Sequence, residues 1–123
     1  MEIEYSNERV KEQCTSVKAA KKLFGGDAVL VHSLFSRIQS LESADTIKDI
    51  VSQKQFRFHK LKNIGNKKYE GYFSIDVKSN REPWRIIIQP LDENGESFTP
   101  CDIDKIAGVC RIVEVSEVSN HYE

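Results

Sequence analysis

The sequence of 123 residues has no run of eighteen or more apolar residues, so we expect no transmembrane helix and no membrane partner. It has only three cysteines, Cys14, Cys101 and Cys110. Because they lack the spacing of metal ligands, we interpret them as reduced, mostly buried thiols. The acidic start, Met1 to Glu4, is not followed by the apolar core of a signal peptide, which predicts a cytoplasmic protein.

Signatures of cofactor-dependent enzymes are missing as well. The three histidines, His32, His59 and His121, are far apart and form no pattern such as HExxH, so the sequence predicts no metal site. Gly25-Gly26 precedes a predicted helix but lacks the Gly-Lys-Ser/Thr of a phosphate loop, and no GxSxG turn is found. We therefore expect no cofactor.

The formal net charge is only −1, but the charges are unevenly distributed along the chain. Residues 1–53 carry seven Lys/Arg and eight Asp/Glu, residues 54–85 carry nine and three, and residues 86–123 carry two and eight. A local positive field attracts a polyanion even when the whole molecule is nearly neutral. The alternative is that the two oppositely charged segments become neighbouring strands whose charges pair.

Helical periodicity dominates the first half of the chain, after a short alternating strand around Ile3 and Tyr5. Each predicted helix begins at a residue whose side chain can accept a backbone hydrogen bond. The predicted helices cover residues 7–24, 27–41 and 45–51, with Ser6 or Asn7, Asp27 and Asp45 as their caps.

After Gln55 the apolar residues recur with a period of two, which is typical of strands. The three consecutive isoleucines of WRIIIQ indicate a strand buried on both faces, and hence a central one. The predicted strands are FRFHKL (56–61), YEGYFSIDV (69–77), WRIIIQ (84–89) and VCRIVEVSEV (109–118), with an irregular loop at 91–108.

Helices followed by strands predict an α+β fold in a single domain, 1–123. We expect the N-terminal strand and two to three helices to pack on one face of a curved, mostly antiparallel sheet of four to five strands. The other face of the sheet is then free to be a working surface.

The segment FRFHKLK (56–62) concentrates cationic and proton-exchanging side chains in one place. RNA carries its own nucleophile, the 2′-hydroxyl. An enzyme that cuts RNA without a metal needs a base near that oxygen, cations around the phosphate and an acid near the leaving 5′-oxygen. Lys, Arg, His and Tyr can serve all of these roles. The candidate RNA-binding residues are Arg57, Lys60, Lys67, Lys68, Arg81 and Asn120.

The chain resembles the RelE/HigB-type toxins of bacterial toxin–antitoxin systems, in particular the HigB-like plasmid maintenance killer proteins. FRFHKLK (56–62), EGYFSIDV (70–77), WRIII (84–88) and the final NHYE (120–123) carry this resemblance, which covers most of the chain. It implies a RelE-like fold and a ribosome-dependent mRNA endonuclease that inhibits translation and growth. It also implies a helix-turn-helix antitoxin (HigA-like) as partner, through which alone the toxin would meet operator DNA.

By motif position, the resemblance implies that Lys62 is the catalytic lysine and His59 its neighbouring histidine. It also implies that Arg85 is the arginine that follows the aromatic residue of the third strand. We expect the fixed fork of Arg85 to hold the scissile phosphate. Lys62, Arg85 and His121 should then surround one phosphate-sized space.

The chain end departs from the family pattern. The family commonly ends in Asp-Tyr-His, whereas this chain has Asn120-His121-Tyr122. Either His121, because histidine exchanges a proton near neutral pH, or Tyr122 is therefore the candidate tail catalyst. Asn120 cannot titrate, so it can only orient or bind.

Two other functions stay open. Relatives with the same fold act by binding DNA gyrase without cutting RNA, although a gyrase binder has no need of the set Lys62, Arg85 and His121. The altered tail is also compatible with a catalytically weakened toxin that only binds its antitoxin. We interpret the aromatic residues of the strands as packing residues rather than base-stacking ones: Phe56, Phe58, Tyr72, Phe73 and Trp84.

Overall fold

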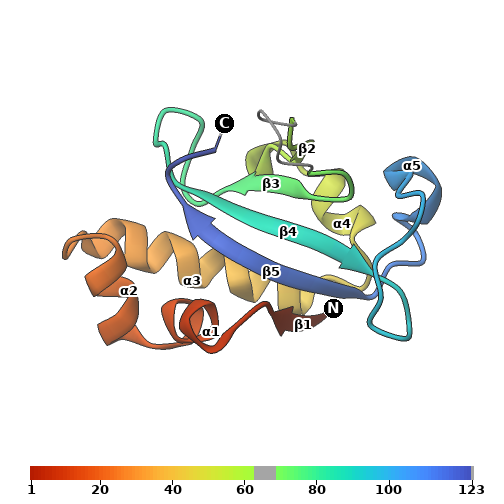
Figure 1. Ribbon diagram of the computed structural model, residues 1–123. Coiled ribbons are helices and arrows are strands. Elements are labelled where there is room, and N and C mark those ends of the chain that lie inside the picture. Colours follow the sequence, from red (N-terminus) through yellow and green to blue (C-terminus); the bar gives the residue numbers. More distant parts are fainter. Residues whose placement is uncertain (63–68, 123) are drawn as a thin grey trace.

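A computed structural model describes residues 1–62 and 69–122; Lys67 and Lys68 lie outside the described residues. Over the described ranges the chain forms an α+β fold with five α-helices and one five-stranded sheet (Figure 1). The strands are β1 (Glu2–Tyr5), β2 (His59–Lys60), β3 (Phe73–Asp76), β4 (Arg85–Leu91) and β5 (Ile112–Ser119). The helices are α1 (Glu8–Thr15), α2 (Val17–Leu23), α3 (Ala28–Ser43), α4 (Lys48–Val51) and α5 (Ile103–Ile106), with a 3₁₀ turn η1 (Lys54–Phe56).

The strand order is β1-β5-β4-β3-β2, with β1 parallel to β5 and all other neighbours antiparallel. The expected α+β class and mostly antiparallel sheet are thus confirmed. The N-terminal strand, expected to pack on one face with the helices, is instead an edge strand of the sheet, because β1 pairs with β5. The isoleucine-rich strand is central as predicted, because β4 lies between β3 and β5. Ile86 and Ile88 are buried in the main core, whereas Ile87 is buried on the opposite face of the sheet.

The single helix predicted over residues 7–24 is two helices. Ser16 has an extended backbone and ends α1, and its hydroxyl accepts a hydrogen bond from the nitrogen of Ala19 (3.3 Å), which starts α2. The helix predicted from Asp27 is confirmed as α3: the Asp27 carboxylate accepts from the nitrogens of Val29 (3.0 Å) and Leu30 (3.2 Å). One buried stripe of α3 faces the sheet: Leu30, Leu34, Ile38 and Leu41.

The predicted strand over residues 56–61 is wrong for most of its length. Phe56 ends the 3₁₀ turn and points into the core, with the Arg37 guanidinium 4.8 Å from the centre of its ring. The backbone of Arg57 has a left-handed conformation (φ 48°), and only His59 and Lys60 pair with β3. The third predicted helix shortens to α4, and the loop predicted at 91–108 contains α5.

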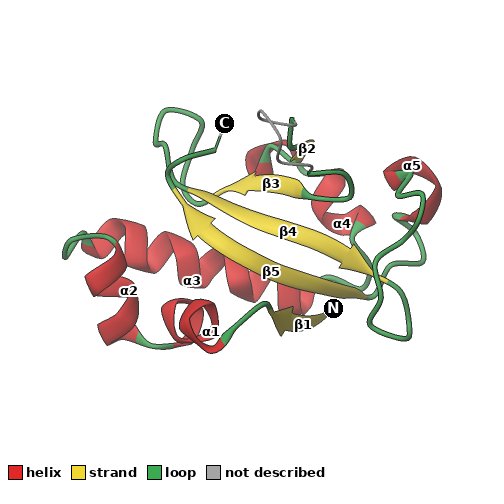
Figure 2. Ribbon diagram, viewed as in Figure 1, coloured by secondary structure: helices red, strands yellow, loops and turns green. Residues whose placement is uncertain are grey.

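The two faces of the sheet differ in what covers them. Helices α1 and α3 gather on one side, where the apolar core lies (Figure 2). The opposite side, called the open face here, carries Ser74, Asp76, Arg85, Ile87, Glu117 and Ser119, which share one set of alternating register positions. Four of these are the buried polar residues of the described chain: Ser74, Asp76, Arg85 and Ser119.

Two further expectations bear on the whole chain. Cys14 and Cys110 are buried free thiols, as predicted, and Cys101 is a partly exposed one. None of the helices in the described residues is long and apolar enough to cross a membrane.

Candidate functional site

His59 lies on the open face because it pairs with Ser74 across β2 and β3. Its Nδ1 is 2.7 Å from the carbonyl oxygen of Arg57. A carbonyl can only accept a hydrogen bond, so Nδ1 carries the ring proton of the neutral side chain. Nε2 is then the nitrogen whose lone pair can take a proton, which is the form that a general base requires.

Asp76 organises the positive charge at one end of β3. The Nε of Arg57 lies 3.1 Å and 3.0 Å from the two oxygens of the Asp76 carboxylate, and the Nε of Arg85 lies 3.2 Å from Oδ1. Asp76 is only 2% exposed, and its backbone carbonyl accepts from the Nε of Arg37 (3.0 Å). A buried carboxylate of this kind is stable because its two guanidinium partners balance its charge.

Arg85 does not have the phosphate-binding geometry that its motif position predicts. Its side chain is 6% exposed, and its terminal nitrogens donate to backbone carbonyls of the loop between β3 and β4. Burial lowers the pKa of Arg85, and the Asp76 carboxylate partly opposes this shift. The guanidinium of Arg85 therefore binds the loop between β3 and β4 rather than pointing to solvent. The acceptors are the carbonyls of Ser79 (3.3 Å), Asn80 (3.3 Å), Glu82 and Trp84 (2.9 Å).

The register also separates Arg85 from the lysines. Arg85 lies opposite Asp76, whereas Lys60 lies opposite Phe73, so roughly 10 Å of strand separates their positions. Lys62 follows two residues further from Arg85 and is exposed. The single phosphate-sized space expected around Lys62, Arg85 and His121 therefore does not include Arg85.

The C-terminal tail turns back over the open face. The backbone nitrogen of His121 donates to the Ser119 hydroxyl (3.1 Å), and the Tyr122 hydroxyl donates to Oε2 of Glu117 (2.9 Å). Asn120 and His121 are exposed, whereas Tyr122 is half-buried. Of the two tail candidates, Tyr122 is therefore the one that the tail packs against the sheet.

Three tyrosines gather where the tail meets the sheet. The hydroxyls of Tyr69 and Tyr122 are 3.5 Å apart, and the Tyr69 ring stands edge-to-face with the rings of Tyr122 (5.6 Å) and Tyr72 (6.4 Å). The hydrogen bond with Tyr69, burial and the Glu117 carboxylate raise the pKa of Tyr122. The phenol therefore holds its proton more firmly than an ordinary tyrosine, and it shares that proton with Glu117 in a hydrogen bond. A pocket of about 220 Å³ is lined by Tyr69, Tyr72, Ile87, Ser116, Glu117 and Tyr122.

One register row connects this pocket to the cationic segment. His59, Ser74, Ile87 and Glu117 lie side by side across β2, β3, β4 and β5. The row spans three strand spacings, about 14 Å. Tyr122 reaches back along it from Glu117 towards Tyr69, so a candidate base and a candidate acid share one surface.

Two other candidate residues lie elsewhere. Lys60 pairs with the core-facing Phe73, so it lies on the face opposite His59, where it lines a second pocket together with Tyr69 and Tyr72. Arg81 is exposed in the loop that Arg85 holds. Lys67 and Lys68 fall outside the described residues. Within the described ranges, no three His, Cys, Asp or Glu side chains come together as a metal site.

Neither Asp76 nor the tyrosine pocket was predicted from the sequence. A period of two along YEGYFSIDV puts Tyr72, Ser74 and Asp76 on one face, so the sequence could have predicted a polar stripe there. The residues that contact this stripe could not be predicted, because they depend on which strands become neighbours.

Comparisons with known proteins give no assignment. No protein-family model matches the chain, and no match was found among curated proteins or among solved structures.

Proposed function

We propose that the chain is the toxin component of a type II toxin–antitoxin system, a RelE/HigB-type ribosome-dependent mRNA endonuclease. The proposal rests on one observation above all: His59 and Tyr122 share the open face beside the cationic segment 57–62. The α+β architecture, with helices on one face of the sheet, also supports it, because the resemblance implies that arrangement.

The proposed reaction uses the nucleophile of the RNA itself. His59 takes the proton of the 2′-hydroxyl through Nε2 as that oxygen attacks the phosphorus. The bond between phosphorus and the 5′-oxygen breaks, and Tyr122 gives that oxygen its proton; the products are a 2′,3′-cyclic phosphate and a 5′-hydroxyl. Lys62 stabilises the charge that develops on the phosphate. His121 is the alternative proton donor of the tail.

Supporting roles follow from the geometry. Arg57 and Arg85 position the segment and the loop through Asp76; Arg85 is buried, whereas Arg57 is partly exposed and stays a candidate RNA contact. Lys60 and Arg81 are exposed and suit contacts with the RNA backbone. Tyr72 packs edge-to-face against Tyr69, in keeping with its interpretation as a packing residue.

The test is cleavage by single-residue variants at matched expression. His59→Ala, Lys62→Ala and Tyr122→Phe should each reduce cleavage roughly 10²–10⁴-fold, because each removes one acid, base or charge contribution. Cleavage is measured by mapping the 5′ ends of cellular mRNA after induction, and with purified ribosomes and message. His32→Ala, an exposed change on α3, is the matched control and should cut as the wild type does.

Undiminished cleavage in the His59, Lys62 and Tyr122 variants would show that the cationic segment is only a solvated surface. If Tyr122→Phe cuts normally and His121→Ala does not, the acid of the tail is His121 instead.

A binding-only function is the second candidate, and the burial of Arg85 favours it because a phosphate contact is lost. A gyrase-type binder would arrest growth. Cellular mRNA would then stay uncut, whereas DNA supercoiling by gyrase would be lost. A weakened toxin would leave growth normal although the folded protein accumulates.

The proposal also requires a partner, the HigA-like antitoxin. We expect it to contact the exposed faces of the first two predicted helices, which are α1 with α2 and then α3. The toxin and the product of the neighbouring gene should therefore elute together in size-exclusion chromatography after co-expression. Separate elution of the two proteins would show that the product of the neighbouring gene is not the antitoxin of this chain.

A further inference from the structure

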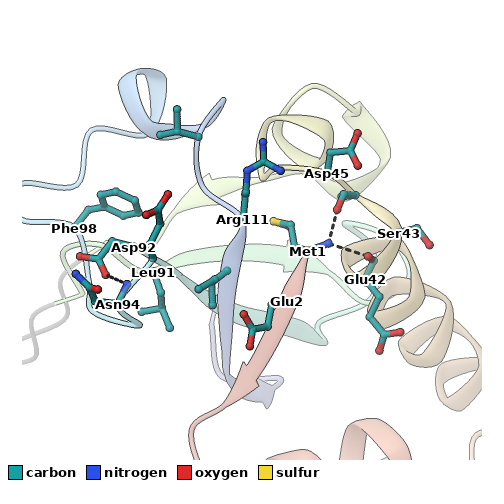
Figure 3. A pocket seen from close by; sticks show the side chains of 14 residues that line it. Met1, Glu2, Glu42, Ser43, Asp45, Leu91, Asp92, Asn94, Phe98 and Arg111 are labelled. Atoms are coloured by element: carbon teal, nitrogen blue, oxygen red, sulfur yellow. Dashed lines mark hydrogen bonds between the residues drawn. The ribbon is translucent and has the colours of Figure 1, made fainter.

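A large groove of about 850 Å³ lies at the end of the sheet where β4 ends and β5 begins (Figure 3). Its walls come from the start of β1, the residues that follow α3, the turn after β4 and the start of β5. The tail and Tyr122 lie towards the other end of β5, so the groove is distinct from the candidate nuclease surface.

The rim of the groove is strongly acidic. Five carboxylates line it against two cations, Arg111 and the Met1 ammonium, and among the described residues none of the five forms an ion pair. Like charges that converge on a hollow strengthen the local field, because the protein wall has a low dielectric constant. The five carboxylates are Glu2, Glu42, Asp45, Asp92 and Glu93.

The interior of the groove is apolar. Leu91 is buried at its base, and Phe98 and Ile112 are partly exposed beside it. Val109 is 66% exposed, more than the other two exposed large apolar side chains, Val17 and Val29. An apolar surface rimmed by polar residues is typical of an interaction site.

The walls are held by backbone hydrogen bonds. The Asp92 carboxylate accepts from the nitrogens of Asn94 (2.9 Å) and Glu96 (3.0 Å), which fixes the turn after β4. The nitrogen of Met1 donates to the carbonyls of Leu41 (3.1 Å), Glu42 (2.8 Å) and Ala44, as Figure 3 shows in part. A fixed groove loses little conformational entropy when a ligand binds.

We propose that this groove binds a cationic segment of a partner protein, in which arginine or lysine side chains flank an apolar one. The cationic groups meet the rim carboxylates, and the apolar side chain packs against Phe98 and Val109. The sign of the rim excludes RNA, since phosphates would be repelled. The proposal does not depend on the proposed nuclease activity.

The test uses a short fluorescein-labelled peptide in which arginine and leucine alternate, titrated with the full chain and followed by fluorescence anisotropy. The double variant Glu42→Lys/Glu93→Lys should weaken binding at least about tenfold, because it reverses two charges of the rim and leaves the hydrogen bonds of Asp92 in place. Asp102→Lys/Asp104→Lys makes the same change in charge outside the groove and should bind like the wild type.

A second pair of variants tests the apolar interior. Val109→Ser should weaken binding several-fold through lost apolar contact. Val29→Ser, which changes another exposed valine, on α3, should have no effect.

Three results would overturn the proposal. The first is no binding of the arginine peptide, or equal binding of its glutamate counterpart. The second is equal weakening by the groove variants and by their controls, since the attraction would then be general. The third is self-association of the chain that the groove variants abolish, because a second copy would then be the occupant.

Discussion

Asp76 lies between two guanidinium groups, which share its single negative charge. Asp76→Asn leaves Arg85 buried without its counter-charge, so it should lower the free energy of unfolding by about 3 kcal/mol. Urea denaturation measures this loss. Asp102→Asn removes an exposed carboxylate 3.9 Å from Lys105 and should cost at most about 0.5 kcal/mol. Equal stability of Asp76→Asn and the wild type would show that the buried pair is dispensable.

Two side chains with raised pKa values, Cys14 and Tyr5, should make the free energy of unfolding fall at alkaline pH. Burial raises the pKa of the Cys14 thiol from 9.0 to about 12. Burial, with the nearby Cys14 and Glu42, raises the pKa of Tyr5 from 10.0 to about 12. In the unfolded chain both groups lose their protons at lower pH. Their contribution to stability is therefore complete below about pH 9 and is lost as the pH rises towards 12.

The corresponding measurement is the free energy of unfolding as a function of pH. The wild type should lose more stability from pH 9 upwards than the double variant Cys14→Ala/Tyr5→Phe, whose side chains at these positions do not titrate in this range. Parallel curves for the two proteins would assign the alkaline loss to other groups.

At the scale of elements, the start of α3 depends on one side chain. Asp27→Ala removes the acceptor for two backbone nitrogens and should lower the free energy of unfolding by about 1 kcal/mol. Glu12→Ala, on the exposed face of α1, is the control and should be nearly neutral. A neutral Asp27→Ala would mean that water replaces the cap at no cost.

The elements that local chemistry determines were predictable from the sequence. Asp27 caps α3 as expected, and three consecutive isoleucines indicate the central strand. The segment 56–61 was not predictable, because Arg57 leaves the strand conformation where it pairs with the distant Asp76. The same reason limits the site: Tyr122 was a candidate from the sequence, but its partner Glu117 follows only from how the tail folds back.

At the scale of the whole molecule, the opposite charges of the two C-terminal segments are not neutralised by the pairs described above. Arg57 and Arg85 pair with Asp76 inside the positive segment, and Lys105 pairs with Asp102 inside the negative one. Lys60, Lys62 and Arg81 of the positive segment are exposed, and the negative segment supplies two carboxylates of the groove, Asp92 and Glu93. The two segments therefore place exposed charges of opposite sign on different parts of the molecule.

The parallel pairing of β1 with β5 has a kinetic consequence. It joins distant parts of the chain: the hydroxyl of Ser6 donates to the carbonyl of Ser116, 110 residues later. At ordinary rates of translation those residues take roughly 5–20 seconds to synthesise. For most of that interval the first strand and the apolar stripes of α1 and α3 exist without the strand that completes their sheet. Folding in the cell therefore ends only after most of the chain has been synthesised.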